Sequence, residues 1–218
     1  AAASAGWVGG QGPHAAAKLA PLPPVPADWS GLDLVLPAAN ALLASFKIWN
    51  TATVGGNVAR SFAAGAMISL AVALDGVAWC WAADGSERRI AVADLVTGNG
   101  TNCLADGEII RAIDLPRAAL TSRAHLEKVA LAQLGRSGAV ATGRIDLDGA
   151  VVFTITAATA WPTVLRYPEM PPPPTLAADV EAVPGHYSDP LGAADWRRSI
   201  SATLALRVRE ELAEGGSP

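Results

Sequence analysis

The chain has 218 residues, of which 51% are hydrophobic and 17% are charged, and its formal net charge is −4. This length suits one domain or two small ones, with ample apolar material for a core. The charged fraction lies below the usual quarter, which indicates that a partner chain covers part of the surface. The chain has no long cluster of Lys and Arg, so its composition argues against a nucleic-acid-binding protein.

The two cysteines, Cys80 and Cys103, are far apart in sequence and form no Cys-x-x-Cys motif. This argues against an iron–sulfur or zinc site in the chain and fits reduced thiols in a cytoplasmic protein. No uninterrupted apolar run reaches membrane-spanning length. The chain starts at Ala1, without an initiator Met and without the basic and apolar regions of a signal peptide. We therefore expect either a processed mature end or an absent true N-terminus.

Residues 1–36 are rich in Ala, Gly and Pro, and the prolines between residues 21 and 26 exclude a helix there. Apolar patterns then predict one helix over residues 37–46 and a second over residues 58–74. A polar segment rich in Thr and Gly joins the two predicted helices.

In this polar segment, Gly55 and Gly56 remove two Cβ atoms in a row, so backbone N–H groups can approach a ligand closely. Thr51, Thr53 and Asn57 add short polar side chains beside those amides. A helix that starts just after the turn would direct its positive end to the same place. These are the features of a phosphate-binding turn. The alternative is a tight structural turn between two helices, where Gly and Asn are common.

Three strands are predicted after the second helix. Residues 77–81 form the first, an Asp84-Gly85 turn leads into the second over residues 88–92, and residues 108–115 form the third. Trp79 and Trp81 share one face of the first strand, where core packing or a subunit contact explains them best.

The second half predicts a three-stranded antiparallel sheet from residues 123–131, 138–147 and 150–159. Pro171 to Pro174 indicate a linker with polyproline II character. A long helix follows over residues 191–212, starting near Asp189-Pro190, with apolar residues at steps of four: Trp196, Ile200, Leu204 and Val208. Arg197 and Arg198 are expected to be solvated. Helices and antiparallel strands together predict an α+β fold.

The sequence gives no independent catalytic centre. His14, His125 and His186 are far apart, lack metal-ligand spacing and are expected to be surface or loop residues. No nucleophile elbow or His-Glu-x-x-His helix occurs. If the chain is part of an enzyme, its chemistry must come from a cofactor.

The segment Lys47–Asn57 resembles the second flavin-binding loop of the FAD-binding subunits of molybdenum hydroxylases, the family of xanthine dehydrogenase and carbon monoxide dehydrogenase. The similarity spans roughly residues 18–212 in the expected order. Its further motifs are Ala64–Leu70, Ala73-Leu74-Asp75, Asp106–Ile113 with Leu115-Pro116, and Leu134–Ser137.

The resemblance implies a PCMH-type FAD-binding lobe over residues 1–120, with an incomplete N-terminal part, and a C-terminal lobe over residues 121–218. It implies a subunit that passes electrons from [2Fe-2S] clusters in a small partner subunit through FAD to an external acceptor. A large molybdopterin subunit would hydroxylate the substrate, in a dimer of heterotrimers. The alternative is a structural subunit of such a complex that has lost flavin binding.

The resemblance also implies site residues. Those that match the loop holding the FAD pyrophosphate are Thr53, Val54, Gly55, Gly56 and Asn57. Ile110 matches a position whose backbone lies near the flavin. Lys128 falls near a family Lys or Arg beside the isoalloxazine, although a slip of one residue would select Glu127.

Two positions depart from the family. Ala66 stands where the family often has Asp. The family's earlier Ala-Gly-Gly-Thr loop has only the candidate Trp7–Gly12, which lacks the Thr and aligns better with the stretch after that loop. Either the N-terminus is incomplete or half of the cofactor cradle has been lost.

Overall fold

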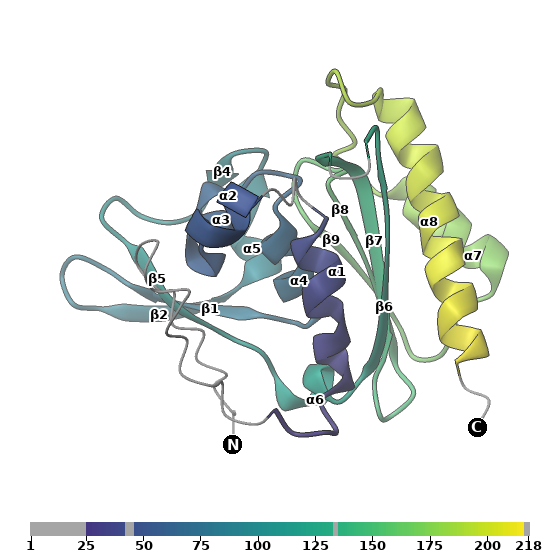
Figure 1. Cartoon of the computed structure of the whole chain (residues 1–218), viewed down its shortest axis with the longest axis horizontal. Coiled ribbons are helices and arrows are strands. Elements are labelled where there is room, and N and C mark those ends of the chain that lie inside the picture. The colour runs from purple at the N-terminus through teal and green to yellow at the C-terminus, as the bar shows by residue number, and fades with distance from the viewer. Residues whose placement is uncertain (1–24, 42–45, 133–134, 216–218) are drawn as a thin grey trace.

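The computed structural model of the chain describes residues 25–41, 46–132 and 135–215. It has the expected α+β fold, in which helices pack on two main antiparallel sheets (Figure 1). The small sheet has the strand order β2-β1-β5, and the large sheet has the order β6-β7-β8-β9. A third sheet consists of the short pair β3 and β4.

The first half begins with short helices. They are η2 (Ser30–Leu34), α1 (Val35–Ala39), α2 (Phe46–Thr51), α3 (Val54–Arg60) and α4 (Ala66–Ala73). The prediction of one helix over residues 37–46 is wrong, because α1 ends at Ala39 and the next described helix starts at Phe46. Residues 42–45 lie outside the described part of the chain.

The predicted helix over residues 58–74 is two helices, α3 and α4. Ser61 stops α3, because it has a left-handed backbone with φ of +52° and its hydroxyl donates to the Val58 carbonyl at 2.9 Å. Asn102 reinforces this end by donating to the Ala59 carbonyl at 2.8 Å. The apolar pattern continues through the break because Val58 and Ile68 enter the same core.

The small sheet confirms the three strands predicted in the first half: β1 (Val77–Trp81), β2 (Glu87–Ala91) and β5 (Ile109–Asp114). The β1–β2 turn contains Gly85 with φ of +85°. Between β2 and β5 lie α5 (Val92–Leu95), β3 (Val96–Gly98) and β4 (Thr101–Asn102), and α6 (Arg117–Leu120) follows β5. One face of the small sheet packs on a core that includes Val58, Ile68 and Val72.

The large sheet confirms the three predicted strands as β6 (Arg123–Ala130), β7 (Ser137–Ile145) and β8 (Val151–Thr156). The prediction of only three strands is wrong, because β9 (Thr163–Tyr167) adds a fourth along β8. This strand has five residues with Pro162 and Pro168 just outside its ends, so its pattern is too short to stand out in the sequence.

Two helices complete the chain. The prediction of a linker from Pro171 to Pro174 is wrong for its last two residues. Helix α7 (Pro173–Ala182) starts at Pro173, whose fixed φ suits the first helical position. The long predicted helix is confirmed as α8 (Ala194–Glu214). It starts after Asp189–Pro190 because Asp189 and Gly192 close a turn through reciprocal backbone hydrogen bonds of 3.0 and 3.1 Å.

Arg197 is fully buried, so the expectation of a solvated side chain there is wrong. Its guanidinium donates to the carbonyl groups of Gly138 and Ala157, and to the Asp189 carboxylate at 2.5 Å. It also lies 4.3 Å from the centre of the Tyr187 ring. These partners replace the water that a buried cation loses.

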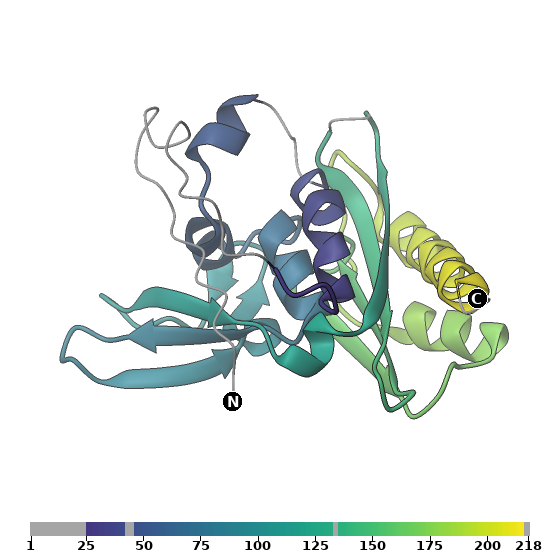
Figure 2. The same ribbon diagram turned by 60° about the horizontal axis from the view of Figure 1, so that its bottom comes forward.

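The large sheet lies between two helical layers (Figure 2). Helices α7 and α8 cover one face, and η2, α1 and α4 lie on the other. The strands β7 and β8 are therefore buried along nearly their whole length. A buried hydrogen bond of 2.6 Å between Ser69 in α4 and Thr156 in β8 joins the first half of the chain to this sheet. Within the described residues, no helix is both long and apolar enough to cross a membrane.

Candidate functional site

The predicted phosphate-binding turn forms the N-terminus of α3. Thr53 is the N-cap residue, with extended φ and ψ of −122° and 153°, and its hydroxyl accepts the Gly56 N–H at 3.0 Å. Both glycines therefore lie inside the first turn of the helix rather than before it. The sequence prediction of polar groups and a helix start at one place holds, with the helix starting earlier than expected.

The backbone N–H groups in the first turn of α3 differ in whether the Thr53 cap provides them with an acceptor. The Gly56 N–H is bound by the Thr53 hydroxyl, and the Asn57 N–H is bound by the Thr53 carbonyl at 2.9 Å. The N–H groups of Val54 and Gly55 precede these and have no acceptor within the helix, as is general for the first turn. Val54 and Gly55 are half-buried and Thr53 is exposed. Two backbone donors and one hydroxyl thus meet at an accessible position.

The two glycines have different structural explanations. A Cβ on Gly56 would lie 2.7 Å from the Thr53 hydroxyl oxygen, so this glycine is needed to make the N-cap. Within the part of the chain that the structure describes, a Cβ on Gly55 would meet no atom closer than the Ile110 carbonyl oxygen at 4.0 Å. The fold itself therefore does not require glycine at position 55.

The structure places Ile110 next to the turn. Ile110 lies in β5, and its carbonyl group is the nearest neighbour to the open side of Gly55. Asn57 has a different role, because its side-chain oxygen accepts the Met67 N–H at 2.9 Å and so fixes α3 to the start of α4. Ala66, at the first position of α4, is buried.

Lys128 lies in β6 and donates to the Asn40 carbonyl at the end of α1, at 2.6 Å. Its neighbour Glu127 contacts His125 at 3.2 Å. Adjacent residues of a strand point to opposite faces, and Leu126 packs in the core that contains helix α1. Lys128 thus faces the first half of the chain, and a slip to Glu127 would select the opposite face. Among the contacts of the described residues, none joins Lys128 to the Thr53–Asn57 turn by a hydrogen bond or ion pair.

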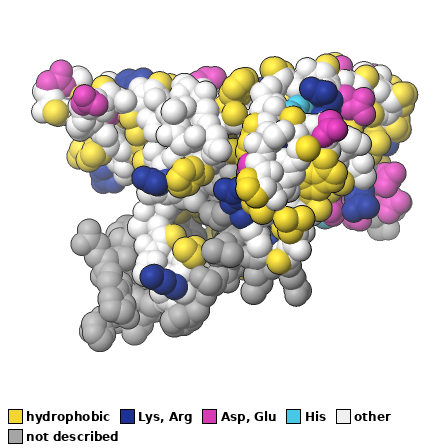
Figure 3. Space-filling view, turned by 90° about the horizontal axis from the view of Figure 1, so that it is seen from above, with side chains coloured by type: hydrophobic (Ala, Val, Ile, Leu, Met, Phe, Trp, Pro, Cys, Tyr) yellow, Lys and Arg dark blue, Asp and Glu magenta, His cyan; other side chains and the backbone are white. Residues whose placement is uncertain are grey.

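Among the described residues, the upper face of the molecule in Figure 1, on the side of α2 and α3, shows no single patch of Lys and Arg side chains. Seen from above in Figure 3, its Lys and Arg side chains are scattered among hydrophobic and neutral ones. An anion at the turn would therefore be bound by backbone amides and the Thr53 hydroxyl rather than by a cluster of cations.

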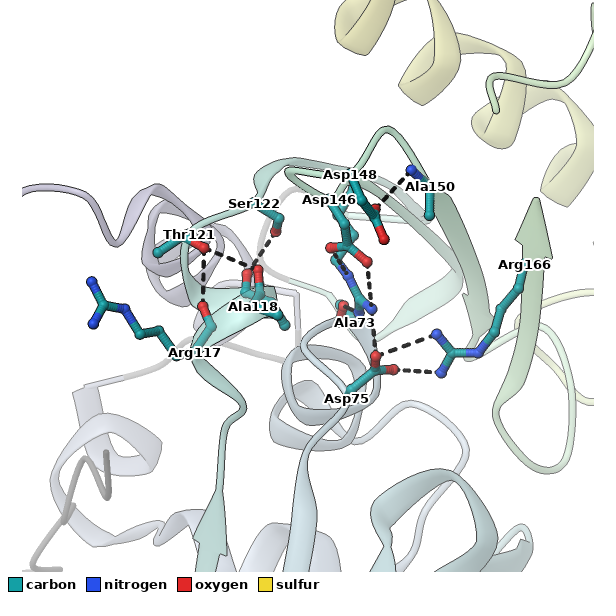
Figure 4. A network of polar contacts seen from close by, with 12 residues as sticks. Ala73, Asp75, Arg117, Ala118, Thr121, Ser122, Asp146, Asp148, Ala150 and Arg166 are labelled. Atoms are coloured by element: carbon teal, nitrogen blue, oxygen red, sulfur yellow. Dashed lines mark hydrogen bonds and ion pairs between the residues drawn. The ribbon is translucent and has the colours of Figure 1, made fainter. Parts of the chain in front are cut away.

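A second polar centre, which the sequence did not predict, joins the two halves of the chain (Figure 4). Asp75, just after α4, forms ion pairs with Arg144 in β7 and with Arg166 in β9, the latter at 2.6 Å. The side chain of Arg144 is 2% exposed, and it also binds Asp146 at 2.8 Å and the Ala73 carbonyl at 2.5 Å. The signal in the sequence was Ala73-Leu74-Asp75, but its partners are about 70 or more residues away along the chain.

The carboxyl of Asp75 is held in its ionised form. Burial by itself would raise its pKa, but hydrogen bonds from Arg166 and Arg144 outweigh that effect and hold the pKa below its ordinary value. Asp75 and Arg166 also line a cleft of about 330 Å³ whose other walls are mainly apolar, including Val72 and Val164. Both charged groups at this cleft are paired with each other, so the arrangement joins α4 to the large sheet.

The histidines show no catalytic arrangement. The buried ring nitrogens of His186 have no hydrogen-bond partner among the described residues, and burial, followed by the nearby Arg198, lowers the pKa of this residue. His125 contacts Glu127, and His14 lies outside the described residues. In the described ranges, no group of three or more His, Cys, Asp or Glu residues could hold a metal ion.

Comparison with known proteins identifies the first half of the chain. Residues 17–118 match the family described as the FAD-binding domain in molybdopterin dehydrogenase. Among curated proteins no match is found. Among solved structures, quinoline 2-oxidoreductase from Pseudomonas putida 86 is similar with a TM-score of 0.73 and 18% identity, covering 88% of this chain and 70% of that one.

Two carbon monoxide dehydrogenases are similar to the same extent. The enzyme from Oligotropha carboxidovorans has a TM-score of 0.74 and 21% identity, covering 86% of this chain and 69% of that one. The enzyme from Hydrogenophaga pseudoflava has a TM-score of 0.71 and 17% identity, covering 87% of this chain and 70% of that one. At these identities the similarity establishes a shared fold across both halves of the chain.

Proposed function

We propose that this chain, whose residues 17–118 belong to the family of FAD-binding domains of molybdopterin dehydrogenases, is the FAD-carrying subunit of a molybdenum hydroxylase. Bound FAD would supply the electron-transfer chemistry, which no side chain of the described residues offers. Electrons would come from [2Fe-2S] clusters in a small partner subunit and leave to an acceptor such as NAD+ or a quinone. A large molybdopterin subunit would hydroxylate the substrate, in a cytoplasmic dimer of heterotrimers.

The observation that carries this proposal is the open space at Gly55. A Cβ there would meet nothing closer than 4.0 Å among the described residues, so their packing does not explain the glycine, whereas a ligand that approaches the backbone would. The amides of Val54 and Gly55 would donate to the pyrophosphate of FAD. The Thr53 hydroxyl accepts from Gly56 and so keeps its own hydrogen for a phosphate oxygen.

The other predicted residues take different parts in this proposal. Gly56 would permit the N-cap, and Asn57 would hold α3 on α4 through Met67. The backbone of Ile110 would lie beside the flavin, and Lys128 would remain the residue near the isoalloxazine. The FAD-binding lobe would cover residues 1–120, and the C-terminal lobe would cover residues 121–218.

A structural subunit that binds no flavin is the alternative. It is favoured by Ala66, whose buried methyl group replaces the carboxylate that the family often has. The candidate for the earlier loop, Trp7–Gly12, lies outside the described residues. The flavin content of the purified wild-type protein separates this alternative from the proposal, because a folded chain without FAD in its native complex would contradict flavin binding.

The sharpest test of the turn uses Gly55, because Gly56 variants would break the Thr53 cap under either interpretation. If the turn binds FAD, we expect Gly55→Val to lower the FAD affinity at least about tenfold, because the side chain would occupy the approach to the amides. The thermal unfolding temperature should change little, since the space is open. FAD released on denaturation, normalised to folded protein, gives the result.

Gly55→Ala and Thr53→Val complete this test. A plain structural turn predicts that Gly55→Ala stabilises the helix by about 0.4–1 kcal/mol with unchanged flavin, because alanine restricts the unfolded chain. Thr53→Val removes both the cap and the proposed phosphate donor, and should reduce both stability and FAD affinity. Undiminished flavin in Gly55→Val would rule out the proposed cradle.

A further inference from the structure

One face of the small sheet, called the open face below, is not covered by another element of the described residues. The inner face of this sheet packs on the core that contains Ala78, Cys80 and Val92. In Figures 1 and 2, α4 and α5 lie on that inner side, and no helix among the described residues lies on the other. Trp79 and Trp81 project from β1 onto this open face and pack edge to face, with ring centres 6.1 Å apart. Trp81 is 37% exposed, so the expectation of core packing does not hold for it.

Charged residues surround the two tryptophans. Arg89 and Arg111 lie over the rings of Trp79 and Trp81, at 5.0 and 5.3 Å from their centres. The Trp79 indole donates to the Glu87 carboxylate at 3.0 Å. A β-bulge in β5 places Arg111 on this face, because it is the residue skipped between Ile110, opposite Cys80, and Ala112, opposite Trp79.

The four charges on this face alternate in sign around the tryptophans. Strand register places Glu87 opposite Trp81 on one side, and Arg111 covers Trp81 from the other side. Further along β1 the order is reversed, because Arg89 lies opposite Trp79 on the β2 side and Asp114 lies opposite Val77 on the β5 side. Arg89 and Asp114 form an ion pair across β1. Among the described residues, Glu87 and Arg111 have no ion-pair partner.

We propose that this open face pairs with the same face of a second copy of the chain. A two-fold axis parallel to β1 would place Glu87 of each copy against Arg111 of the other, with the Trp81 side chains in contact between them. Such an isologous contact requires a self-complementary surface, and the alternating charges provide one. The pairing gives both unpartnered charges a partner at once, which favours this axis over one perpendicular to the strands.

The composition and size of the face define the kind of contact. Trp and Arg are the residues most enriched at binding hot spots, and here both are already held rigid by their ring contacts. The sheet is three strands wide with strands of five or six residues, which gives a face of roughly 15 Å by 17 Å. The area of this face is well below the roughly 800 Å² per partner of a standard interface. The proposed dimer is therefore weak, with a dissociation constant in the micromolar range or above. Its formation does not depend on flavin binding.

Charge reversal and charge exchange test the proposal on the full chain. Sedimentation equilibrium across the micromolar to millimolar range should show a monomer–dimer equilibrium for the wild type. Arg111→Glu and Glu87→Arg should each weaken the dimer by roughly a hundredfold, because like charges would face each other twice across the two-fold axis. The double variant Glu87→Arg with Arg111→Glu should restore dimerisation to within about tenfold of the wild type.

A matched control and three outcomes decide the result. Leu147→Glu adds a charge at a residue that is 82% exposed in the turn between β7 and β8, and it should leave the dimer unchanged. Circular dichroism confirms that each variant is folded. A wild type that stays monomeric overturns the proposal, as does a dimer that Arg111→Glu leaves intact. Single variants that dissociate without rescue by the double variant overturn the proposed two-fold arrangement.

Discussion

The two main sheets of this protein differ in how their faces are covered and in what their arginines contact. The large sheet is covered on both faces. Arg144 in β7 and Arg197 in the covering helix α8 are buried, and both donate to carboxylate and backbone carbonyl groups. The small sheet is covered on one face, and its arginines Arg89 and Arg111 lie exposed over tryptophan rings. The same residue type thus fixes the fold in one sheet and leaves groups available for binding in the other. Most of the stability should reside in the large sheet.

The largest effect is expected for a core residue of the large sheet. Phe153 in β8 is fully buried and packs edge to face with Tyr167, with ring centres 6.2 Å apart. Phe153→Ala should lower the free energy of unfolding by about 3–5 kcal/mol, because it removes apolar contacts and leaves a cavity. Chemical denaturation measures this. A loss no larger than that of a small-sheet residue would contradict the assignment of stability to the large sheet.

An intermediate effect is expected at Asp75, which joins the large sheet to α4. Asp75→Asn should lower the free energy of unfolding by about 1–3 kcal/mol, since it leaves Arg144 with one carboxylate fewer in a partly exposed network. Asn also tolerates the left-handed φ of +51° at this position. The change therefore removes the charge and keeps the backbone.

The pH dependence of this effect has a defined sign. The pKa of Asp75 is lowered in the folded state, so its stabilisation is present above the unfolded pKa of about 3.9 and is lost as the pH falls through the folded pKa. The difference between wild type and Asp75→Asn should be constant above about pH 5 and shrink below that range. Asp148→Asn, which removes a carboxylate in an exposed turn, is the matched control and should have little effect on the free energy of unfolding. A difference that grows in acid would contradict the ionised pair.

The smallest effect on monomer stability is expected on the open face of the small sheet. Trp81→Ala should cost about 1 kcal/mol or less, because the ring is partly exposed and loses mainly the contacts with Trp79 and Arg111. The same substitution should abolish the proposed dimer. Measuring unfolding at a concentration where the chain is monomeric separates the two effects. A loss comparable to that of Phe153→Ala would show that this face is structural.

Local patterns in the sequence predicted the elements that depend on near neighbours. The strands β1, β2, β5, β6, β7 and β8 and the helix α8 follow from alternation, turn residues and steps of four. The break between α3 and α4 did not follow, because the end of α3 at Ser61 is reinforced by Asn102, which is distant in sequence. The helix α7 was missed because four consecutive prolines indicate a linker until the position of Pro173 at the helix start is known.

The candidate site was predictable in part for the same reason. Thr53, Gly55 and Gly56 adjoin each other in the chain, and their arrangement follows from one helix start. The side-chain partner of Asn57 lies in the next helix, and that of Lys128 lies in α1, so neither could be assigned from the sequence. The buried charges of Arg144 and Arg197 were unpredictable because burial of a cation depends on acceptors from several strands.

The junction at Ala157 has a consequence for how the chain is made. Ala157 has a left-handed backbone with φ of +63°, its N–H donates to Ala63 at 2.9 Å, and its carbonyl accepts from Tyr187 and Arg197. The loop between α3 and α4, which contains Ala63, is therefore held through Ala157 by Tyr187 and Arg197, which come much later in the chain. During synthesis, the surroundings of the Thr53–Asn57 turn are completed only when α8 has left the ribosome. If the Thr53–Asn57 turn binds FAD as proposed, a chain that stops before Arg197 should therefore not acquire flavin.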